Sequence, residues 1–151
     1  MITEPEQLSL REVRARAHPN CVVCGAANKR GLRLKFRSSA DGSVQATFDC
    51  LKACEGYIDV LHGGIVTSLL DGAMTNCLFA HGHRGVTAEI TVRFRHPVQT
   101  GKPAAVRAWL ERCCRPLHVL KAELMQDGQL KATARGKFME YTHLAAEGRR
   151  L

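Results

Sequence analysis

A histidine, two glycines and one carboxylate in the run LHGGIVTSLLDGAMTN, residues 61–76, have the types and spacing for carbonyl chemistry. Gly63 and Gly64 stand at the expected start of an apolar helix, where the first backbone N–H groups have no intrahelical partner. The helix dipole adds partial positive charge there. Such a helix start can stabilise the oxyanion that develops when a thioester carbonyl is attacked. Asp71, the only acid in the run, is the candidate nucleophile or general base.

The spacing of these groups predicts how the site is assembled. From Gly63 to Asp71 the chain advances eight residues, or about 12 Å along a helix. One carbonyl therefore cannot contact both groups of a single chain. If both act on one bond, they come from different subunits, with two helices side by side across a two-fold axis. The spacing predicts an obligate dimer with two shared sites.

Three polar residues share one stripe of this otherwise apolar helix, since Ser68, Asp71 and Thr75 fall at i, i+3 and i+7. A carboxylate there would be partly desolvated, which raises its pKa and its basicity. The alternative is that Asp71 only satisfies neighbouring hydroxyl or backbone groups. Two alternatives also apply to His62, which either contacts the ligand or orients the loop. The glycines could likewise serve only the tight turn into the helix.

Hydrophobic periodicity predicts one long helix over about 63–80, apolar on most of its circumference and therefore buried. Gly82 or Gly85 is expected to end it. A short amphipathic helix is expected to run to about Ala17, after a capping-box pattern at Thr3 and Glu6. Strands are expected over about 32–36, 44–48, 87–95, 104–112, 117–126 and 130–139.

This order of elements predicts an α+β fold in which an antiparallel sheet of about six strands wraps around the long helix. Turn pairs at 41–42 and 127–128 join neighbouring strands as hairpins. In the segment 87–95, alternation assigns one face to apolar side chains and the other to polar ones. The apolar face holds Ala88, Ile90, Val92 and Phe94, and the polar face holds Thr87, Glu89, Thr91, Arg93 and Arg95.

The 151 residues suffice for one domain with a sizeable core. We expect an N-terminal extension at 1–19, the domain at 20–141 and a flexible tail at 142–151. No apolar run approaches the roughly 20 residues that span a membrane. The N-terminal residues carry several acids and lack an apolar stretch, unlike a secretory or transit peptide. Seven cysteines without an export signal indicate free thiols in a cytoplasmic protein.

The formal charge of +8 does not by itself indicate a nucleic-acid partner. The basic residues are scattered along the chain. Only two tyrosines and one tryptophan are present, and none belongs to the aromatic–basic repeat that a stacking platform requires. The charge therefore indicates solubility, or a site for a phosphorylated small molecule.

The cysteines offer a possible zinc site. Cys21 and Cys24 have the spacing of a metal-binding knuckle, and Cys50 with Cys54 could complete a four-thiolate set. The second pair has looser spacing and no glycine-rich turn of its own. We therefore expect free or packed thiols and no metal.

Two further pairs have simple structural explanations. His81 and His83 follow the long helix, where side chains commonly satisfy the last carbonyl groups, so we do not expect a metal-ligand pair. Cys113 and Cys114 are neighbours on a strand and point to opposite faces, so a disulfide between them is not expected.

Three blocks of the sequence together resemble the PaaI-like group of hotdog-fold thioesterases. They are CVVCGAANKRGLRLKF at 21–36, GYIDVLHGGIVTSLLDGAM at 56–74 and VTAEITVRFRHPV at 86–98. The resemblance covers roughly residues 20–141, which would then form a hotdog domain. It implies hydrolysis of acyl-CoA thioesters without a metal or redox cofactor. It also implies assembly as a homodimer or as a homotetramer of two dimers.

The resemblance implies roles for single residues. The N–H of Gly63, with that of Gly64 next in line, would polarise the carbonyl group. Asp71 would be a nucleophile that forms a mixed anhydride or a base that activates water. Thr75 and Thr87 match positions where related enzymes place a hydroxyl near the acid or the attacking water. Candidates for binding the phosphates of coenzyme A are Arg93, Arg95, Lys102 and Arg107.

Two positions depart from the pattern of the relatives. Several relatives carry Asn or Gln six residues before the histidine, to hold the lytic water or the carbonyl, and this substrate-binding position is Gly56 here. Asp59 stands where the family often has glycine. These departures leave open a second function, a non-catalytic acyl-CoA-binding or regulatory module. A zinc-stabilised nucleic-acid binder built on the cysteine pairs is a third alternative.

Overall fold

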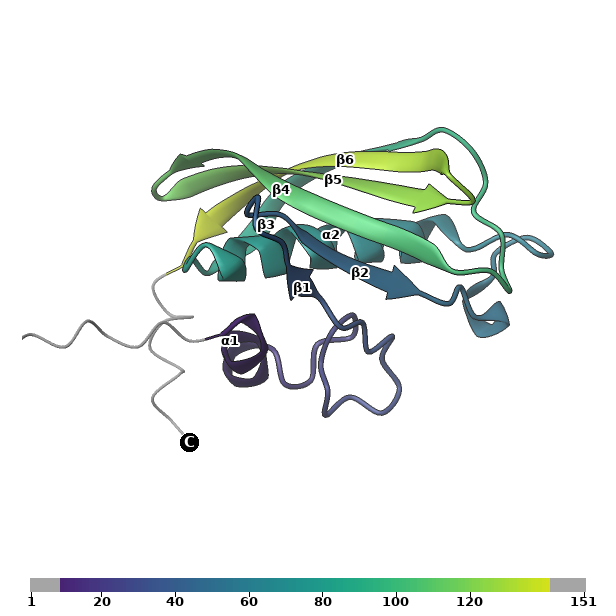
Figure 1. Cartoon of the computed structure of the whole chain (residues 1–151), viewed down its shortest axis with the longest axis horizontal. Coiled ribbons are helices and arrows are strands. Elements are labelled where there is room, and N and C mark those ends of the chain that lie inside the picture. The colour runs from purple at the N-terminus through teal and green to yellow at the C-terminus, as the bar shows by residue number, and fades with distance from the viewer. Residues whose placement is uncertain (1–8, 142–151) are drawn as a thin grey trace, which may run out of the picture.

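The computed structural model describes residues 9–141, and in this part a six-stranded antiparallel sheet wraps around one long helix (Figure 1). The strand order is β1-β2-β4-β5-β6-β3, so β1 and β3 form the two edges. The expected α+β architecture is confirmed. The helices are α1 (Leu10–Ala17), α2 (Gly63–Ala80) and the 3-10 turn η1 (Lys52–Cys54). The strands are β1 (Arg37–Ser38), β2 (Val44–Phe48), β3 (Gly85–Phe94), β4 (Ala104–Cys114), β5 (Leu117–Gln126) and β6 (Gln129–Glu140).

Helix α2 occupies the predicted range because its sequence marks both ends and its side chains fill the core. His62 caps the first turn, and Gly82 follows the last turn with a φ of 78°, which suits glycine. Between these ends, most of the circumference packs against the concave face of the sheet. The fully buried side chains of α2 include Leu69, Leu70, Met74 and Leu78. The hydrophobic effect thus holds the helix against the sheet.

The expected strand at 32–36 is wrong, although its alternation is real. Leu34 and Phe36 point into the core, but the backbone N–H groups of Leu32 and Leu34 donate to the carbonyls of Val22 and Val23. The preceding knuckle therefore satisfies this backbone, and pairing with β2 is limited to Arg37–Ser38.

Helix α1 ends at Ala17 as expected, but its cap differs from the prediction. The Ser9 hydroxyl accepts from the backbone N–H of Glu12, and the Glu12 carboxylate accepts from the Ser9 backbone N–H, which completes a capping box directly before Leu10. Thr3 and Glu6, and the tail at 142–151, lie outside the described residues.

Strand β3 contains a bulge that changes which side chains face the helix. The pairing with β6 shifts between Thr87 and Glu89, so Ala88 is the extra residue. Thr87 lies opposite Phe138, a fully buried core residue, and Ile90 also packs against the core. The assignment of Thr87 to the polar face is therefore wrong. Strict alternation fails there because, with one residue inserted, side chains on the two sides of the bulge no longer follow one alternating pattern of faces.

The knuckle at 21–25 packs directly on α2 one residue beyond Asp71. A Cβ at Gly72 would lie 2.5 Å from Cγ1 of the buried Val23, so only glycine allows this approach. Gly72→Ala should lower the free energy of unfolding by about 1–3 kcal/mol, measured by urea denaturation. The same change should cost less in a Val23→Ala background, where the clash is absent. Equal costs in both backgrounds would contradict this contact.

Among residues 9–141 there is no helix with the length and hydropathy required to cross a membrane.

Candidate functional site

The start of α2 presents one backbone donor to its surroundings. The Nδ1 atom of His62 accepts from the N–H of Gly64 at 2.9 Å. The N–H groups of Ile65 and Val66 donate to the His62 carbonyl at 2.9 and 3.1 Å. Within residues 9–141, the N–H of Gly63 has no such partner. His62 therefore orients the turn, and Gly63 is the donor that remains for a ligand, ahead of Gly64.

An apolar groove of about 630 Å³ opens beside this donor. Gly63, His62 and Gly56 line it together with Arg95, so the structure brings these four candidate residues into one place. The other lining residues are mostly apolar and come from the loop before α2, from the first turn of α2, from the end of β3 with the turn that follows it, and from β6. They include Tyr57, Val60, Val66, Phe94, Pro97 and Val98. Such a groove can hold an apolar group next to the Gly63 donor.

The two positions that depart from the relatives have clear structural settings. A Cβ at Gly56 would lie 3.3 Å from Cδ2 of His62, so the glycine lets the histidine ring pack against the backbone. Asp59 has a φ of 59°, a left-handed conformation that glycine adopts most easily and that Asp tolerates better than most residues. The turn geometry thus explains why glycine suits position 59.

Asp71 lies one helical turn after Ser68 and is held by Thr87, whose hydroxyl donates to Oδ1 at 2.7 Å. Because of the bulge at Ala88, the Thr87 side chain points toward α2. Burial raises the pKa of Asp71 above its ordinary value, and the hydrogen bond from Thr87 opposes this shift. Charge on the nearby Cys21 raises the same pKa, and charge on His18 lowers it. A half-buried carboxylate of raised basicity suits a general base or nucleophile.

The other members of the polar stripe differ in what they can offer. The Ser68 hydroxyl donates to the Gly64 carbonyl at 2.8 Å, one turn back along the helix, so its hydrogen is already used. Thr75 is buried one turn beyond Asp71. Of the three polar residues, Asp71 is therefore the one whose side chain is best placed to act as a base or nucleophile.

The groove beside Gly63 and the candidate acid Asp71 lie at different places along α2. Neither Asp71 nor Thr87 lines the groove beside Gly63. The advance of eight residues from Gly63 to Asp71 corresponds to about 12 Å along the helix axis. As expected, one carbonyl group therefore cannot contact both residues within a single chain.

The four basic candidates lie in different places. Arg95 lines the groove, whereas Arg93 lies on the outer face of the sheet, near Trp109 and Arg135. Lys102 pairs with Asp127 at 3.0 Å, and Arg107 pairs with Asp41 at 2.7 Å. Of the four, only Arg95 is placed to meet a ligand held at Gly63.

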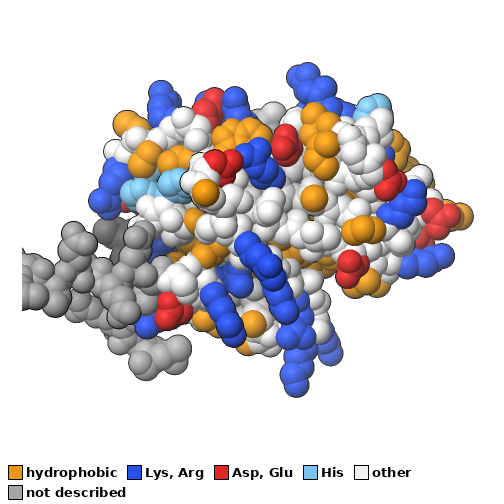
Figure 2. Space-filling model, in the orientation of Figure 1, with side chains coloured by type: hydrophobic (Ala, Val, Ile, Leu, Met, Phe, Trp, Pro, Cys, Tyr) orange, Lys and Arg blue, Asp and Glu red, His pale blue; other side chains and the backbone are white. Residues whose placement is uncertain are grey.

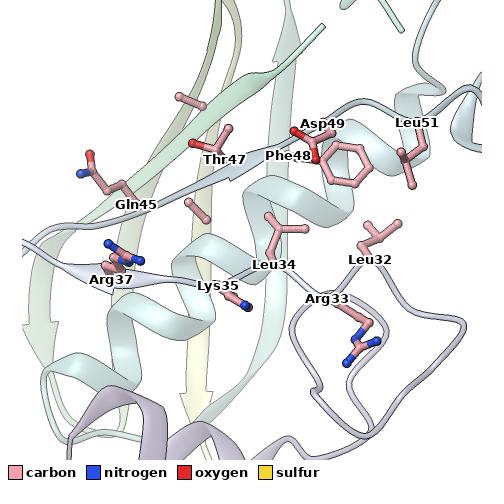
Figure 3. Close-up of a pocket in the computed structure, with 12 residues that line it drawn as sticks. Leu32, Arg33, Leu34, Lys35, Arg37, Gln45, Thr47, Phe48, Asp49 and Leu51 are labelled. Carbon is pink, nitrogen blue, oxygen red and sulfur yellow. The ribbon is translucent and has the colours of Figure 1, made fainter. Parts of the chain in front are cut away.

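A second cleft, of about 530 Å³, lies between the segment 32–37 and β2 (Figure 3). It exists because this segment leaves the sheet instead of pairing with β2. The segment 32–37 contributes three basic side chains to this cleft, Arg33, Lys35 and Arg37. Figure 2 shows Lys and Arg side chains gathered on the lower half of one face. Gly63 and Asp71 do not line this cleft.

The structure does not bring the two cysteine pairs together into the four-thiolate set considered as an alternative. Ligand atoms of Cys21 and Cys24 lie within 4.8 Å of one another and of a His18 ring nitrogen, and this group does not include Cys50 or Cys54. Hydrogen bonds from Cys24 and His18 hold the pKa of the Cys21 thiol well below its ordinary value. All seven cysteines are free thiols.

His81 and His83 do not face a common point. His81 Nδ1 lies 2.9 Å from the Cys77 carbonyl, as expected for a side chain at the end of α2. His83 instead contacts Glu140 of β6 at 3.1 Å. The contact of His83 with Glu140 could not be predicted from the sequence, because only the folded sheet brings these residues together. His18 was also missed, although it stands three residues before Cys21 and its spacing was a signal for the knuckle group.

The model of the thioesterase superfamily matches residues 59–133. This match spans the whole of α2, including Gly63 and Asp71. No curated protein sequence gives a significant match.

Solved structures of similar fold include three informative ones. A phenylacetic acid degradation-related protein of Ralstonia eutropha is 26% identical, with a TM-score of 0.69 over 84% of this chain and 98% of its own. A mutant of the phenylacetic acid degradation protein PaaI from Thermus thermophilus is 21% identical, with a TM-score of 0.67 over 73% and 95%. A hypothetical thioesterase from Streptococcus pneumoniae, solved with coenzyme A, is 18% identical, with a TM-score of 0.67 over 71% and 87%.

Proposed function

Because the chain belongs to the thioesterase superfamily, and its fold is that of the PaaI-like proteins, we propose that it hydrolyses an acyl-CoA thioester to the free acid and coenzyme A. The observation that carries the proposal is the Gly63 N–H at the start of α2, which lacks a partner within residues 9–141 and opens onto an apolar groove. The half-buried Asp71, whose pKa is raised, supplies the second requirement.

In the proposed reaction, the thioester carbonyl oxygen accepts from the Gly63 N–H, and the positive end of the α2 dipole stabilises the negative charge that develops there. Asp71 of the other subunit acts on the carbonyl carbon. As a nucleophile it forms a mixed anhydride while the carbon–sulfur bond breaks, and water then cleaves the anhydride. As a base it takes a proton from water, whose oxygen bonds to the carbonyl carbon; the carbon–sulfur bond then breaks, and the proton passes to the departing thiolate. Both routes use Asp71, Gly63 and water and need no cofactor.

The proposed assembly is a homodimer, with a homotetramer of two dimers as its extension. Within residues 9–141, strand β3 is a ten-residue edge that pairs only with β6, and such an edge invites pairing with another chain. Exposed apolar side chains lie along it and in the loop before α2, where Tyr57 is 86% and Ile58 is 82% exposed. Phe94 of β3 is exposed as well. A partner on this surface would cover them and could bring its Asp71 to the Gly63 groove.

Two parts of the substrate would contact different residues of the groove. The acyl chain would lie against its apolar residues, and Arg95 at the rim would meet a phosphate of coenzyme A. The structural neighbour solved with coenzyme A supports this class of ligand. The free thiols support a reducing cytoplasm as the location.

The test is thiol release from a panel of short, long, branched and aromatic acyl-CoAs, measured for the wild type beside Asp71→Asn. Release by the wild type alone would support a thioesterase that uses this acid, and would begin to identify the acyl group. No release by either protein would refute the proposed activity. With acyl-CoA binding intact, that result would favour a non-catalytic binding module, the second candidate, which the missing amide side chain at Gly56 supports.

The hydrogen bond from Thr87 should lower the pH above which Asp71 is a charged, active carboxylate. Thr87→Val removes the hydrogen bond that lowers the pKa of Asp71, whereas the burial that raises it remains. Because the reaction needs the carboxylate, the rate falls as pH drops through this pKa. The acidic limb of kcat/KM should therefore move to higher pH in Thr87→Val and stay in place in Thr87→Ser. An unmoved limb in the valine variant would contradict this role.

A further inference from the structure

Four side chains meet at the opposite end of β3 from the groove, where the proposed hydrolysis does not use them. His83 precedes β3, Cys113 lies on β4, His118 on β5 and Glu140 on β6. The two imidazole rings lie 4.4 Å apart between their centroids. Figure 2 shows His side chains reaching the surface at the left end of the molecule, where β6 ends in Figure 1.

Glu140 fixes the orientation of both rings. Its Oε1 lies 3.1 Å from Nδ1 of His83 and 2.7 Å from Nε2 of His118. Its Oε2 pairs with Arg115 at 2.9 Å, which favours the charged carboxylate. Since a carboxylate only accepts hydrogen bonds, each ring donates to it through the nitrogen named. The lone pairs of the neutral rings are therefore left on Nε2 of His83 and Nδ1 of His118.

One of these lone pairs has no partner among residues 9–141. His118 is fully buried, and its Nδ1 makes no hydrogen bond in this part of the chain. Buried polar atoms are nearly always paired, so an unpaired acceptor at this depth needs a specific explanation. A cation bound to Nδ1 would supply it. A carboxylate that holds the far nitrogen of a histidine is the usual support of a metal-ligating imidazole.

The third ligand has suitable chemistry and position. Cys113 Sγ lies 3.5 Å from Nε2 of His83. Zinc bonds of about 2.3 Å to sulfur and 2.0–2.1 Å to nitrogen, at a tetrahedral angle, separate such ligand atoms by about 3.5 Å. One ring nitrogen of His83, one ring nitrogen of His118 and the Cys113 Sγ all lie within 4.8 Å of one another. Cys113 is exposed, which leaves a path for the ion and room for a water as fourth ligand.

We propose that His83, Cys113 and His118 bind a zinc ion, with Glu140 orienting both imidazoles. Binding converts the Cys113 thiol to a thiolate and releases its proton to solvent. The ion would join the strands β4 and β5 to the start of β3. His118 pairs with Phe138 in the sheet, and Phe138 pairs with Thr87, so the site would also brace the strand position that holds Asp71.

The knuckle group of His18, Cys21 and Cys24 is the competing site for the same ion. Its His18 also has a buried Nδ1 without a hydrogen-bond partner among residues 9–141, but the ring makes an edge-on contact with Phe79 and no carboxylate orients it. Its Cys24 is buried and accepts from Asn76 at 3.5 Å, whereas Cys113 is exposed to an incoming ion. The cluster at Glu140 is therefore the better candidate, and the experiment separates the two.

The test uses the full chain, reduced and stripped of metal with EDTA, and titrated with Zn²⁺ by calorimetry and with Co²⁺ by absorbance. We expect Co²⁺ to give a thiolate-to-metal charge-transfer band. Cys113→Ser should abolish this band and weaken Zn²⁺ binding at least about tenfold. Cys114→Ser is the matched control, since its side chain points to the other face of β4, and it should bind as the wild type does.

Two further readouts make the result decisive. Zn²⁺ should raise the melting temperature of the wild type but not that of Cys113→Ser, because only the folded wild type binds the ion. In EDTA the two proteins should melt together, which shows that the exposed substitution leaves the fold intact. Absence of the band in the wild type, or equal Zn²⁺ binding in Cys113→Ser, would overturn the proposal. Binding lost in Cys21→Ser alone would place the ion in the knuckle and overturn it equally.

Discussion

Asp71→Asn is expected to lower kcat for thioester hydrolysis by about three orders of magnitude or more, because the amide can neither attack the carbonyl nor take a proton from water. Asparagine keeps the shape of the side chain, and its oxygen can still accept from Thr87. The measurement is steady-state thiol release with the best acyl-CoA of the panel. Activity within a factor of about ten of the wild type would contradict the role of this acid.

The same variant should be at least as stable as the wild type. Burial raises the pKa of Asp71 in the folded state, so the fold binds this proton more tightly than the unfolded chain does. Such a carboxyl group lowers stability once pH rises above its unfolded pKa of about 3.9, and asparagine removes that cost at pH 7. A melting temperature no lower than that of the wild type therefore separates lost chemistry from lost folding. Ser68→Ala, one turn away, is the matched control and should keep its activity.

Gly63→Pro is expected to lower kcat by about 10²–10³-fold, the usual cost of removing one oxyanion donor. Proline removes the N–H but suits the first position of a helix. His62 is already extended, with φ of −60° and ψ of 134°, as a residue before proline requires. The substitution thus deletes the donor while α2 keeps its start. The measurement is kcat for thiol release, with the helical circular dichroism signal compared between variants.

Gly63→Ala is the control for the added carbon atoms. A Cβ at this position would lie 3.6 Å from the Phe94 ring, an ordinary contact, and the N–H remains. The alanine variant should therefore keep far more activity than the proline variant. If both lose activity equally, crowding of the groove rather than loss of the donor is the cause, and the oxyanion role of Gly63 is contradicted.

The elements with strong local signals could be predicted from the sequence. Helix α2 was placed correctly because an apolar run lies between a capping histidine and Gly82, and β5 because alternation lies between two turns. The segment 32–36 has the same alternation but is not a strand, since its backbone bonds are made by the knuckle. Alternation reports which side chains are buried, and it does not report where the backbone hydrogen bonds go.

The candidate site was predictable in part for the same reason. The type and spacing of Gly63 and Asp71 depend on one helix, and spacing along a helix is fixed. The partner of Asp71 was proposed from resemblance, and only the bulge at Ala88 explains how Thr87 reaches it. The cluster at Glu140 was missed entirely. Its members come from three strands and the segment before β3, so only the register of the sheet brings them together.

Mixed dimers of Gly63→Pro and Asp71→Asn test most directly whether each site is shared between two chains. The two variants, each nearly inactive alone, are co-expressed with different affinity tags, and the mixed dimer is purified. One of its two sites combines the intact Gly63 of one subunit with the intact Asp71 of the other. Activity should therefore return to about half that of the wild-type dimer. Mixed dimers no more active than the parent variants would contradict a shared site.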